Sequence, residues 1–269
     1  MICAAVITLV AASAAGGQAL PLKDTEWTLE GGTGGYCIWY LADPALAQKL
    51  VPSSTSLVPA GTGGELPMLL AGTIREEPKF AQWIPGSICV GFYQKVVSAG
   101  RTIAEAKPGK PIMMATSSIA AQAAHGVPGA NHYLLDFMTN DRGVANAADD
   151  IGVDMSSIEM VRRSPLEGED PNVILTLGGI QITWAGHAIA DSSVGKTHGV
   201  SFGYGGPKSI NWLINMESSP QSSRLMVGVL LVGGGNNLAK VLKASPVRAI
   251  GPESRGGTAT ITFHAVTKK

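Results

Sequence analysis

The chain has 269 residues, of which 45% are hydrophobic and only 15% are charged. This composition excludes a disordered chain, and the length is sufficient to bury a sizeable core. The 20 basic and 20 acidic residues balance to a formal net charge of +0, which argues against a nucleic-acid partner or an anionic membrane surface, because both require clustered Lys and Arg.

The first residues resemble a secretory signal peptide. An apolar stretch at 2–10 runs into small residues that offer cleavage sites at 12–14 and 17–19, although no Lys or Arg precedes it. The alternatives are a membrane anchor, for which the apolar run is shorter than the ~20 residues needed, and a buried N-terminal helix. We therefore expect residues 1–19 to be removed and a single domain, 20–269, to be secreted or periplasmic.

Two cysteines, Cys37 and Cys89, remain after that segment. An even pair in an exported chain predicts one disulfide. Closing a loop of about fifty residues stabilises a fold by roughly 4 kcal/mol in the chain-entropy model. The alternative is two buried free thiols, which behave as small hydrophobic groups.

In the first half of the chain, strands and short helices alternate. Aromatic and β-branched residues at 36–41 and 88–97 predict strands. Between them, Asp43 and the proline after it predict a helix that ends near residue 50. A second helix is predicted to start at Asn140 or Asp141 and to run to Ile151, where a glycine follows its last residue.

The second half is richer in strands. A Gly-Gly turn joins 173–177 to 180–184 as a hairpin. Strands at 199–204, 209–216, 225–232 and 258–266 follow at the spacing of an antiparallel meander, with a helix at 236–243 before the last of them. We therefore expect a mainly β (α+β) fold, an antiparallel β-barrel or sandwich with a few short helices.

Motifs for cofactors and metals are missing from the sequence. The glycines at 31–35 precede a strand instead of following one into a helix, as a dinucleotide site requires. The glycines at 233–235 lack the other residues of a phosphate-binding loop. No histidine spacing is typical of zinc, and no Gly-x-Ser-x-Gly elbow is present. We expect neither a cofactor nor a metal.

A histidine and an aspartate form the first candidate site. In a regular strand, His132 and Asp136 would share one face with Leu134. If that face lines an apolar interior, burial raises the pKa of the carboxyl and makes it a usable general acid or base. The alternative is that Asp136 caps the following helix or faces solvent.

Further candidates lie on two of the predicted strands. Tyr93 and Lys95 share one side of the 88–97 strand, where an inward lysine would be unusual. Trp184 and His187 close the hairpin strand, where a histidine can act on a ligand at a barrel mouth. The alternative for His187 is an ordinary place on the surface.

Four stretches together resemble the acetoacetate decarboxylase-like superfamily. Residues 40–52 are similar to its early strand and helix, and 91–96 to its central strand with a Tyr-x-Glu motif. Residues 134–152 resemble the strand and helix before its active-site turn, and 244–252 resemble its C-terminal phrase. The resemblance implies a β-barrel with an apolar internal cavity that suits a small ligand.

The departures from this family bear on the chemistry. Its decarboxylases use a Gly-x-Pro-Lys turn whose lysine forms a Schiff base, and the best-matching turn here, 152–155, ends in Met155. A thioether cannot form an imine, so decarboxylation by that route is not expected. Lys95 stands where the family has the glutamate of Tyr-x-Glu, which leaves a relocated Schiff-base lysine as an alternative.

The sequence thus predicts an exported, cofactor-independent enzyme that acts on a small apolar molecule by elimination, pericyclase-like cyclisation or isomerisation, as a lyase, cyclase or isomerase of secondary metabolism. One alternative is a non-catalytic carrier of a hydrophobic molecule, and a weaker one is a decarboxylase or aldolase that uses Lys95.

The expected partner is a small molecule, with a homo-oligomer left open and no stable membrane anchor. Candidate catalytic residues are Lys95, His132 and Asp136, and candidate substrate-binding residues are Tyr93, Tyr133, Met155, Trp184 and His187.

Overall fold

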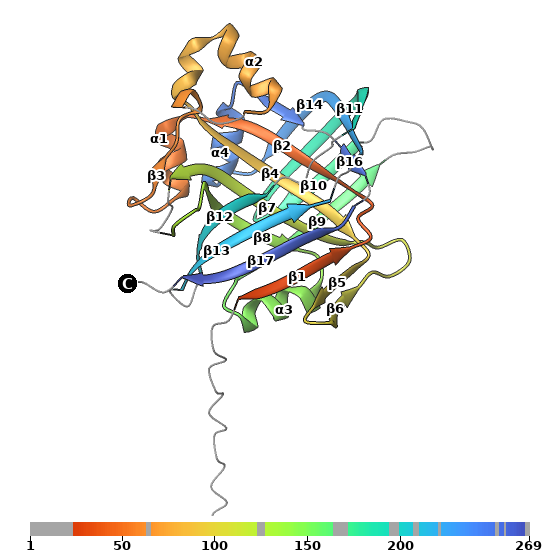
Figure 1. Cartoon of the computed structure of the whole chain (residues 1–269). Helices are drawn as coiled ribbons and strands as arrows, with labels where there is room; N and C mark the ends of the chain where they lie inside the picture. Colours follow the sequence, from red (N-terminus) through yellow and green to blue (C-terminus); the bar gives the residue numbers. More distant parts are fainter. Residues whose placement is uncertain are drawn as a thin grey trace, which may run out of the picture.

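The computed structural model describes residues 24–62, 66–122, 127–163, 172–193, 199–206, 210–219, 222–250, 253–255 and 257–266. The strands are β1 (Thr25–Glu30), β2 (Gly34–Ala42), β3 (Ser56–Leu57), β4 (Ile84–Tyr93), β5 (Lys95–Ser98), β6 (Arg101–Glu105), β7 (Ile112–Gln122), β8 (His132–Thr139), β9 (Ser156–Arg163), β10 (Asn172–Leu177), β11 (Ile180–Ser193), β12 (Val200–Gly205), β13 (Asn211–Ser218), β14 (Ser222–Gly233), β15 (Arg248–Ile250), β16 (Glu253–Arg255) and β17 (Ala259–Val266). The helices are α1 (Pro44–Ala47), α2 (Met68–Glu76), α3 (Arg142–Asp150) and α4 (Asn237–Ala244), with 3-10 turns η1 (Gln48–Leu50), η2 (Ala60–Thr62) and η3 (Pro78–Gln82). The predicted mainly β fold with a few short helices is confirmed (Figure 1).

Strand pairs close one part of the sheet into a barrel. Hydrogen-bonded neighbours run in the order β2, β4, β7, β8, β9, β10, β11, β14 and β16, and β16 returns to β2. All of these pairs are antiparallel except β8–β9. The ring depends on short ladders at two joints: Ser254↔Gly35 between β16 and β2, and two parallel residue pairs between β8 and β9.

A second set of strands continues from the barrel wall. β8 also pairs with β12, and from there the order is β13, β17, β1 and β5, which directly follows β4 along the chain. Each set encloses its own apolar cluster. We call the cluster that contains Ile38, Ile88 and Leu175 the barrel interior, and the one that contains Trp27, Phe137 and Phe263 the second core.

The β7 strand separates the two clusters. Met113 and Ala115 belong to the barrel interior, whereas Ile112 and Met114 belong to the second core. Both of its faces are therefore buried, and every residue of β7 up to Ile119 is buried. A strand buried on both sides has no polar alternation, so periodicity does not predict it.

Helix caps follow the sequence expectations. The Asp43 side chain accepts hydrogen bonds from the backbone N–H groups of Ala45 and Leu46 at the start of α1. Asp141 caps α3 and Asn236 caps α4 in the same way. The α2 helix, which packs with η3 over the outer side of β2, was not predicted (Figure 1). Among the described helices, none has the length and apolarity that crossing a membrane requires.

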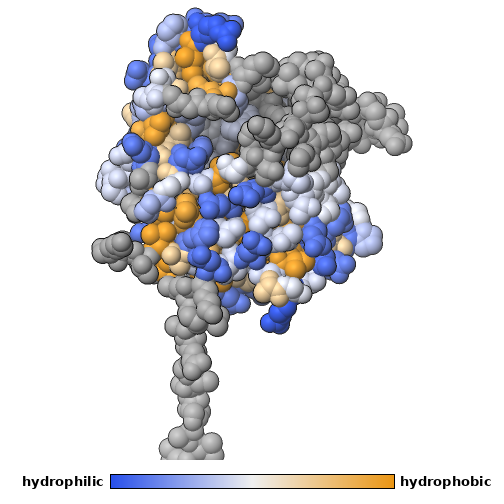
Figure 2. Space-filling view, viewed as in Figure 1, coloured by the Kyte–Doolittle hydropathy of each residue, from blue (hydrophilic) through white to orange (hydrophobic). Residues whose placement is uncertain are grey.

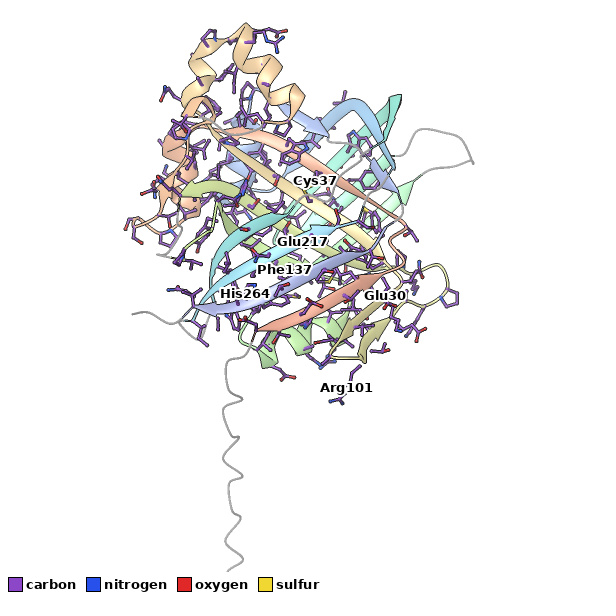
Figure 3. The ribbon with its side chains drawn as sticks, in the orientation of Figure 1. Glu30, Cys37, Arg101, Phe137, Glu217 and His264 are labelled. Carbon is purple, nitrogen blue, oxygen red and sulfur yellow. A yellow bond between two sulfur atoms is a disulfide. The ribbon has the colours of Figure 1, made fainter. Side chains whose placement is uncertain are left out.

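Cys37 and Cys89 form a disulfide, as predicted, and the alternative of two free thiols is wrong. The two residues are directly opposite each other on β2 and β4. Their neighbours Ile38 and Ile88 point into the barrel interior, so the disulfide lies on the outer side of the same wall (Figure 3 labels Cys37).

The outer faces of β1 and β17 are polar. Alternate residues of β17, from Ala259 to Phe263, are buried in the second core, while Thr260 and Thr262 between them are half-buried. Figure 2 shows hydrophilic side chains spread over this face, where Figure 3 labels Glu30 and His264. His264 Nδ1 lies 3.0 Å from the Asp24 carboxylate.

Replacing Gly86 by alanine should destabilise the barrel. A Cβ atom at Gly86 would overlap the ring of Tyr40, which packs across the strand inside the barrel. We expect Gly86→Ala to lower the free energy of unfolding by about 1–3 kcal/mol, as overpacking of a core does. Gly72 in α2 is the control, because a Cβ atom there meets nothing within 4 Å, and Gly72→Ala should be neutral or stabilising. Urea unfolding measures both, and equal effects would contradict the packing of Tyr40.

Candidate functional site

A bulge in β8 turns Asp136 into the barrel. Ser118 of β7 pairs with Leu134 and Ser117 pairs with Asp136, so Leu135 has no partner in this register. The extra residue reverses the inward and outward alternation at this point. Asp136 therefore faces the same side as Met138, whose side chain belongs to the barrel interior.

The predicted pairing of His132 with Asp136 is wrong, because the bulge places the two residues on opposite faces. The His132 ring lies 6.0 Å from that of Phe202, a residue of the second core. Its Nδ1 atom is 2.9 Å from Oδ1 of Asn131, and burial lowers its pKa. His132 thus belongs to the other side of the sheet.

Burial raises the pKa of the Asp136 carboxyl above its ordinary value. Hydrogen bonds from the Ser156 hydroxyl and the Phe137 backbone N–H lower the pKa, and the nearby charge of Asp154 raises it. The carboxylate also reaches the β10–β11 turn, since a Cβ atom on Gly178 would lie 3.5 Å from Asp136 Oδ2. The alternative that Asp136 caps α3 is wrong, because Asp141 makes that cap.

A row of side chains crosses the barrel wall from Asp136. Its cross-strand neighbour is Ser117 on β7, followed by Ile88 on β4 and Ile38 on β2. Directly opposite residues of neighbouring strands project to the same face. Ser117 is fully buried, and its hydroxyl makes no hydrogen bond to any group in the described part of the chain.

Tyr40 lies next to this row. Its phenol donates to the backbone carbonyl oxygen of Ser118 at 3.1 Å, and burial raises its pKa. The Ser117 hydroxyl lies close to the Tyr40 phenol and lowers the Tyr40 pKa, which offsets part of the effect of burial. The two groups do not form a hydrogen bond of normal geometry. The wall of the barrel therefore carries a polar seam made of Tyr40, Ser117, Asp136 and Ser156.

The barrel interior also contains a cavity of about 20 Å³. A space of this size holds about one water molecule. Trp184 is 3% exposed and stacks obliquely on Tyr36, with 5.6 Å between ring centroids. Trp184 was predicted from the sequence as a binding residue, and it lies in the cavity wall. The lining residues are Tyr36, Ile38, Ile88, Val90, Met160, Leu175, Ile182 and Trp184.

Two tyrosines in and near β8 have raised pKa values. Tyr133 is opposite Ile119 and packs against the barrel interior, where burial raises its pKa. Tyr204 of β12 donates from its hydroxyl to the Asp154 carbonyl oxygen at 3.4 Å. Burial, followed by the charge of Asp154, raises the Tyr204 pKa to about 12.

Tyr204 packs against the second core, next to a split in the sheet. β8 pairs with β12 at His132 and Tyr133 but with β9 only from Met138 onward. Asp136 lies in the stretch between these two ladders. Sequence reasoning missed Ser117, Ser156 and Tyr204, because only the bulge and the split in the sheet bring them near Asp136.

Other predicted residues lie away from this site. Lys95 Nζ is 3.7 Å from the Glu30 carboxylate on the outer face, with 37% of its side chain exposed, and the prediction that it enters the cavity is wrong. The neighbouring residue, Val96, is the one that enters the second core. Tyr93 and Met155 pack against the second core, and burial raises the Tyr93 pKa to about 12. The side chain of His187 lies outside the described residues.

Metal ligands do not cluster in the described part of the chain: it contains no group of three His, Cys, Asp or Glu side chains that could hold a metal ion. The two carboxylates of the site differ in exposure to solvent, because Asp136 is half-buried and Asp154 is exposed. The arrangement offers one desolvated carboxyl, an apolar cavity, and the hydroxyls of Tyr40, Ser117, Ser156 and Tyr204.

No family model matches the sequence, and no curated protein is similar to it. Solved structures with a related fold include an acetoacetate decarboxylase-like enzyme from Sphingomonas wittichii RW1, with 10% identity, a TM-score of 0.49, and coverage of 93% of this chain and 95% of that one. The enduracididine biosynthesis enzyme MppR in complex with pyruvate has 11% identity and a TM-score of 0.48, with coverage of 90% and 88%.

Acetoacetate decarboxylase from Legionella pneumophila subsp. pneumophila str. Philadelphia 1 has 11% identity and a TM-score of 0.46, with coverage of 90% of this chain and 87% of that one. Two of these proteins, an acetoacetate decarboxylase and an acetoacetate decarboxylase-like enzyme, carry the name of the superfamily that the sequence motifs resemble. At such low identity, none of them assigns a role to a residue of this chain.

Replacing Asp136 by asparagine should change how stability depends on pH. A carboxyl whose pKa is raised on folding stabilises the fold fully below its unfolded pKa of 3.8, and this contribution is lost as the pH rises through the folded value. We therefore expect Asp136→Asn to gain stability relative to the wild type between about pH 3.5 and about pH 7. Urea unfolding at both pH values measures the difference.

Two neighbouring variants provide the controls. Ser156→Ala removes a hydrogen bond that lowers the Asp136 pKa and should steepen the pH dependence, whereas Asp154→Asn removes a charge that raises it and should flatten it. Identical pH profiles for the wild type and Asp136→Asn would contradict a desolvated carboxyl at this position.

Proposed function

We propose that the protein is an enzyme that converts a small, mostly apolar molecule inside the barrel, with Asp136 as the group that takes up and returns a proton. The observation that carries this proposal is the inward orientation of Asp136, a desolvated carboxyl in an otherwise apolar enclosure. A raised pKa makes the carboxylate a stronger base than an ordinary aspartate, which suits it to general acid–base catalysis.

The polar neighbours of Asp136 support a proton-transfer role. The Ser156 hydroxyl donates to the carboxylate, and Ser117 beside it has a buried hydroxyl with no partner among the described residues. A hydroxyl in that position can hold a substrate oxygen next to the carboxyl. Elimination, cyclisation or isomerisation needs only such a group and a shape that orients the substrate, and no cofactor takes part in the proposed reaction.

Among the described side chains, neither Met155 nor Lys95 supports a Schiff-base mechanism. Met155 carries a thioether at the position of the superfamily's lysine, and Lys95 is paired with Glu30 on the outer face. We therefore propose a lyase, cyclase or isomerase of secondary metabolism that works without an imine.

The cavity has a volume of about 20 Å³, which holds about one water molecule. It must therefore enlarge when a substrate enters. Met160 is the adaptable part of its lining, because an unbranched thioether side chain changes rotamer more easily than a branched one. It is half-buried, whereas Ile88 and Ile182 are fully buried.

The second candidate function is a carrier. It is favoured by the cavity lining, which consists of aliphatic and aromatic side chains. A carrier binds a hydrophobic molecule and releases it unchanged, so that Asp136 would contribute nothing beyond its effect on stability.

An isomerisation assay separates the two functions. In 3-cyclohexen-1-one, a base removes a proton next to the carbonyl group and returns it at the far end of the double bond, which gives the conjugated isomer and an absorbance change. We expect Asp136→Asn to slow this conversion by about 10²–10⁴-fold. The wild-type rate should rise with pH through the raised pKa of Asp136, because the base must be ionised.

The matched controls are Lys95→Met and His132→Gln, which alter predicted catalytic residues that lie away from the site. Both should retain the wild-type rate. Conversion that is equally fast in Asp136→Asn, or no conversion by the wild type together with binding of the ketone, would favour the carrier.

We also propose that the protein is exported. The disulfide between Cys37 and Cys89 supports this, because disulfides persist in oxidising compartments. The predicted signal peptide, residues 1–19, lies outside the described residues. Expression of the full chain in a bacterium should give a periplasmic product whose mass corresponds to cleavage in the region 12–19; an intact N-terminus in the cytoplasm would contradict export.

A further inference from the structure

We infer that the barrel cavity is a subsite for a neutral molecule that presents one hydrogen-bond acceptor to the indole N–H of Trp184. This inference rests on the proposed function and narrows its substrate class to apolar molecules with a single ketone, ether or ester oxygen. The inference starts from the residues that line the cavity and from one polar atom of the lining residue Trp184.

The polar atom is Nε1 of Trp184. It is buried and has no hydrogen-bond partner among the described residues, and Trp184 as a whole is 3% exposed. Buried indole N–H groups usually find a partner. The indole ring lines the cavity, so a guest that widens the cavity brings its oxygen within reach of this N–H.

The lining also determines the charge of the ligand. It consists of four aromatic or long apolar side chains from β9, β10 and β11, together with Tyr36, Ile38, Ile88 and Val90 from β2 and β4. None of these residues is a Lys, Arg or His. An ionised carboxylate would lose its hydration here without gaining a counter-charge, so the acceptor belongs to a neutral molecule.

Trp212 shows that an unpaired indole alone does not make a site. Its Nε1 atom is also buried without a partner among the described residues, but Trp212 belongs to the second core and does not line the cavity. It therefore serves as an internal control with the same chemistry.

Three small probes of nearly equal shape test the inference. These are 2-butanone, its hydrocarbon counterpart 2-methyl-1-butene, and the anion propanoate. In protein labelled with nitrogen-15 at the indoles, 2-butanone should shift the N–H resonance of Trp184 downfield and leave that of Trp212 in place. The alkene should bind without a downfield shift, and propanoate should leave both resonances unchanged.

Trp184→Phe keeps a ring in the wall and removes the donor. Its preference for 2-butanone over the alkene should fall about fivefold, the usual contribution of one hydrogen bond, whereas Trp212→Phe should keep the wild-type preference. An unmoved Trp184 resonance at saturating 2-butanone, an unchanged preference in Trp184→Phe, or equal binding of propanoate would overturn the inference.

Asp136→Asn separates this inference from the proposed function. The variant should still bind 2-butanone at Trp184, because the two residues lie on different walls of the barrel. Ketone binding without any isomerisation would reject the proposed function and keep the subsite. Isomerisation that depends on Asp136, without a response of Trp184, would reject the subsite and keep the function.

Discussion

The site depends on a single extra residue in β8. Because Leu135 is bulged out of the ladder with β7, the strand reverses its faces, and a carboxyl that would lie with His132 enters the barrel interior instead. The same strand then leaves β12 and joins β9. The bulge and the change of partner act together: one turns Asp136 inward and the other brings Ser156 and Tyr204 beside it. Bulges commonly re-aim side chains near functional sites in this way.

The interior combines an apolar enclosure with a few polar groups that it leaves unsatisfied. Ser117 and Trp184 are both buried with no partner for their polar atoms among the described residues. A buried polar group without a partner costs stability, and such groups are rare in folded proteins. The second core also contains one such group, the indole N–H of Trp212. The desolvated carboxyl of Asp136 is what distinguishes the barrel interior from that core.

Much of the fold was predictable from local patterns. Residues close together in the sequence indicate the helix caps at Asp43, Asp141 and Asn236 and the Gly-Gly hairpin. The even number of cysteines after the first segment indicates the disulfide. The site was less predictable, because its geometry depends on register. A strand taken as regular puts His132 with Asp136, and only the pairing with β7 reveals the bulge. The orientation of Lys95 depends in the same way on a break in the strand after Tyr93, which composition does not signal.

The disulfide makes the two sides of the cavity unequal. Cys37 stands between Tyr36 and Ile38, and Cys89 stands between Ile88 and Val90, so that a covalent bond fastens together the two strands that supply half of the cavity lining. The opposite half comes from β9, β10 and β11, which join the ring at one end through only two residue pairs between β8 and β9. The cross-linked half of the cavity wall therefore lies opposite the half that carries the tryptophan and that ends at the short joint between β8 and β9.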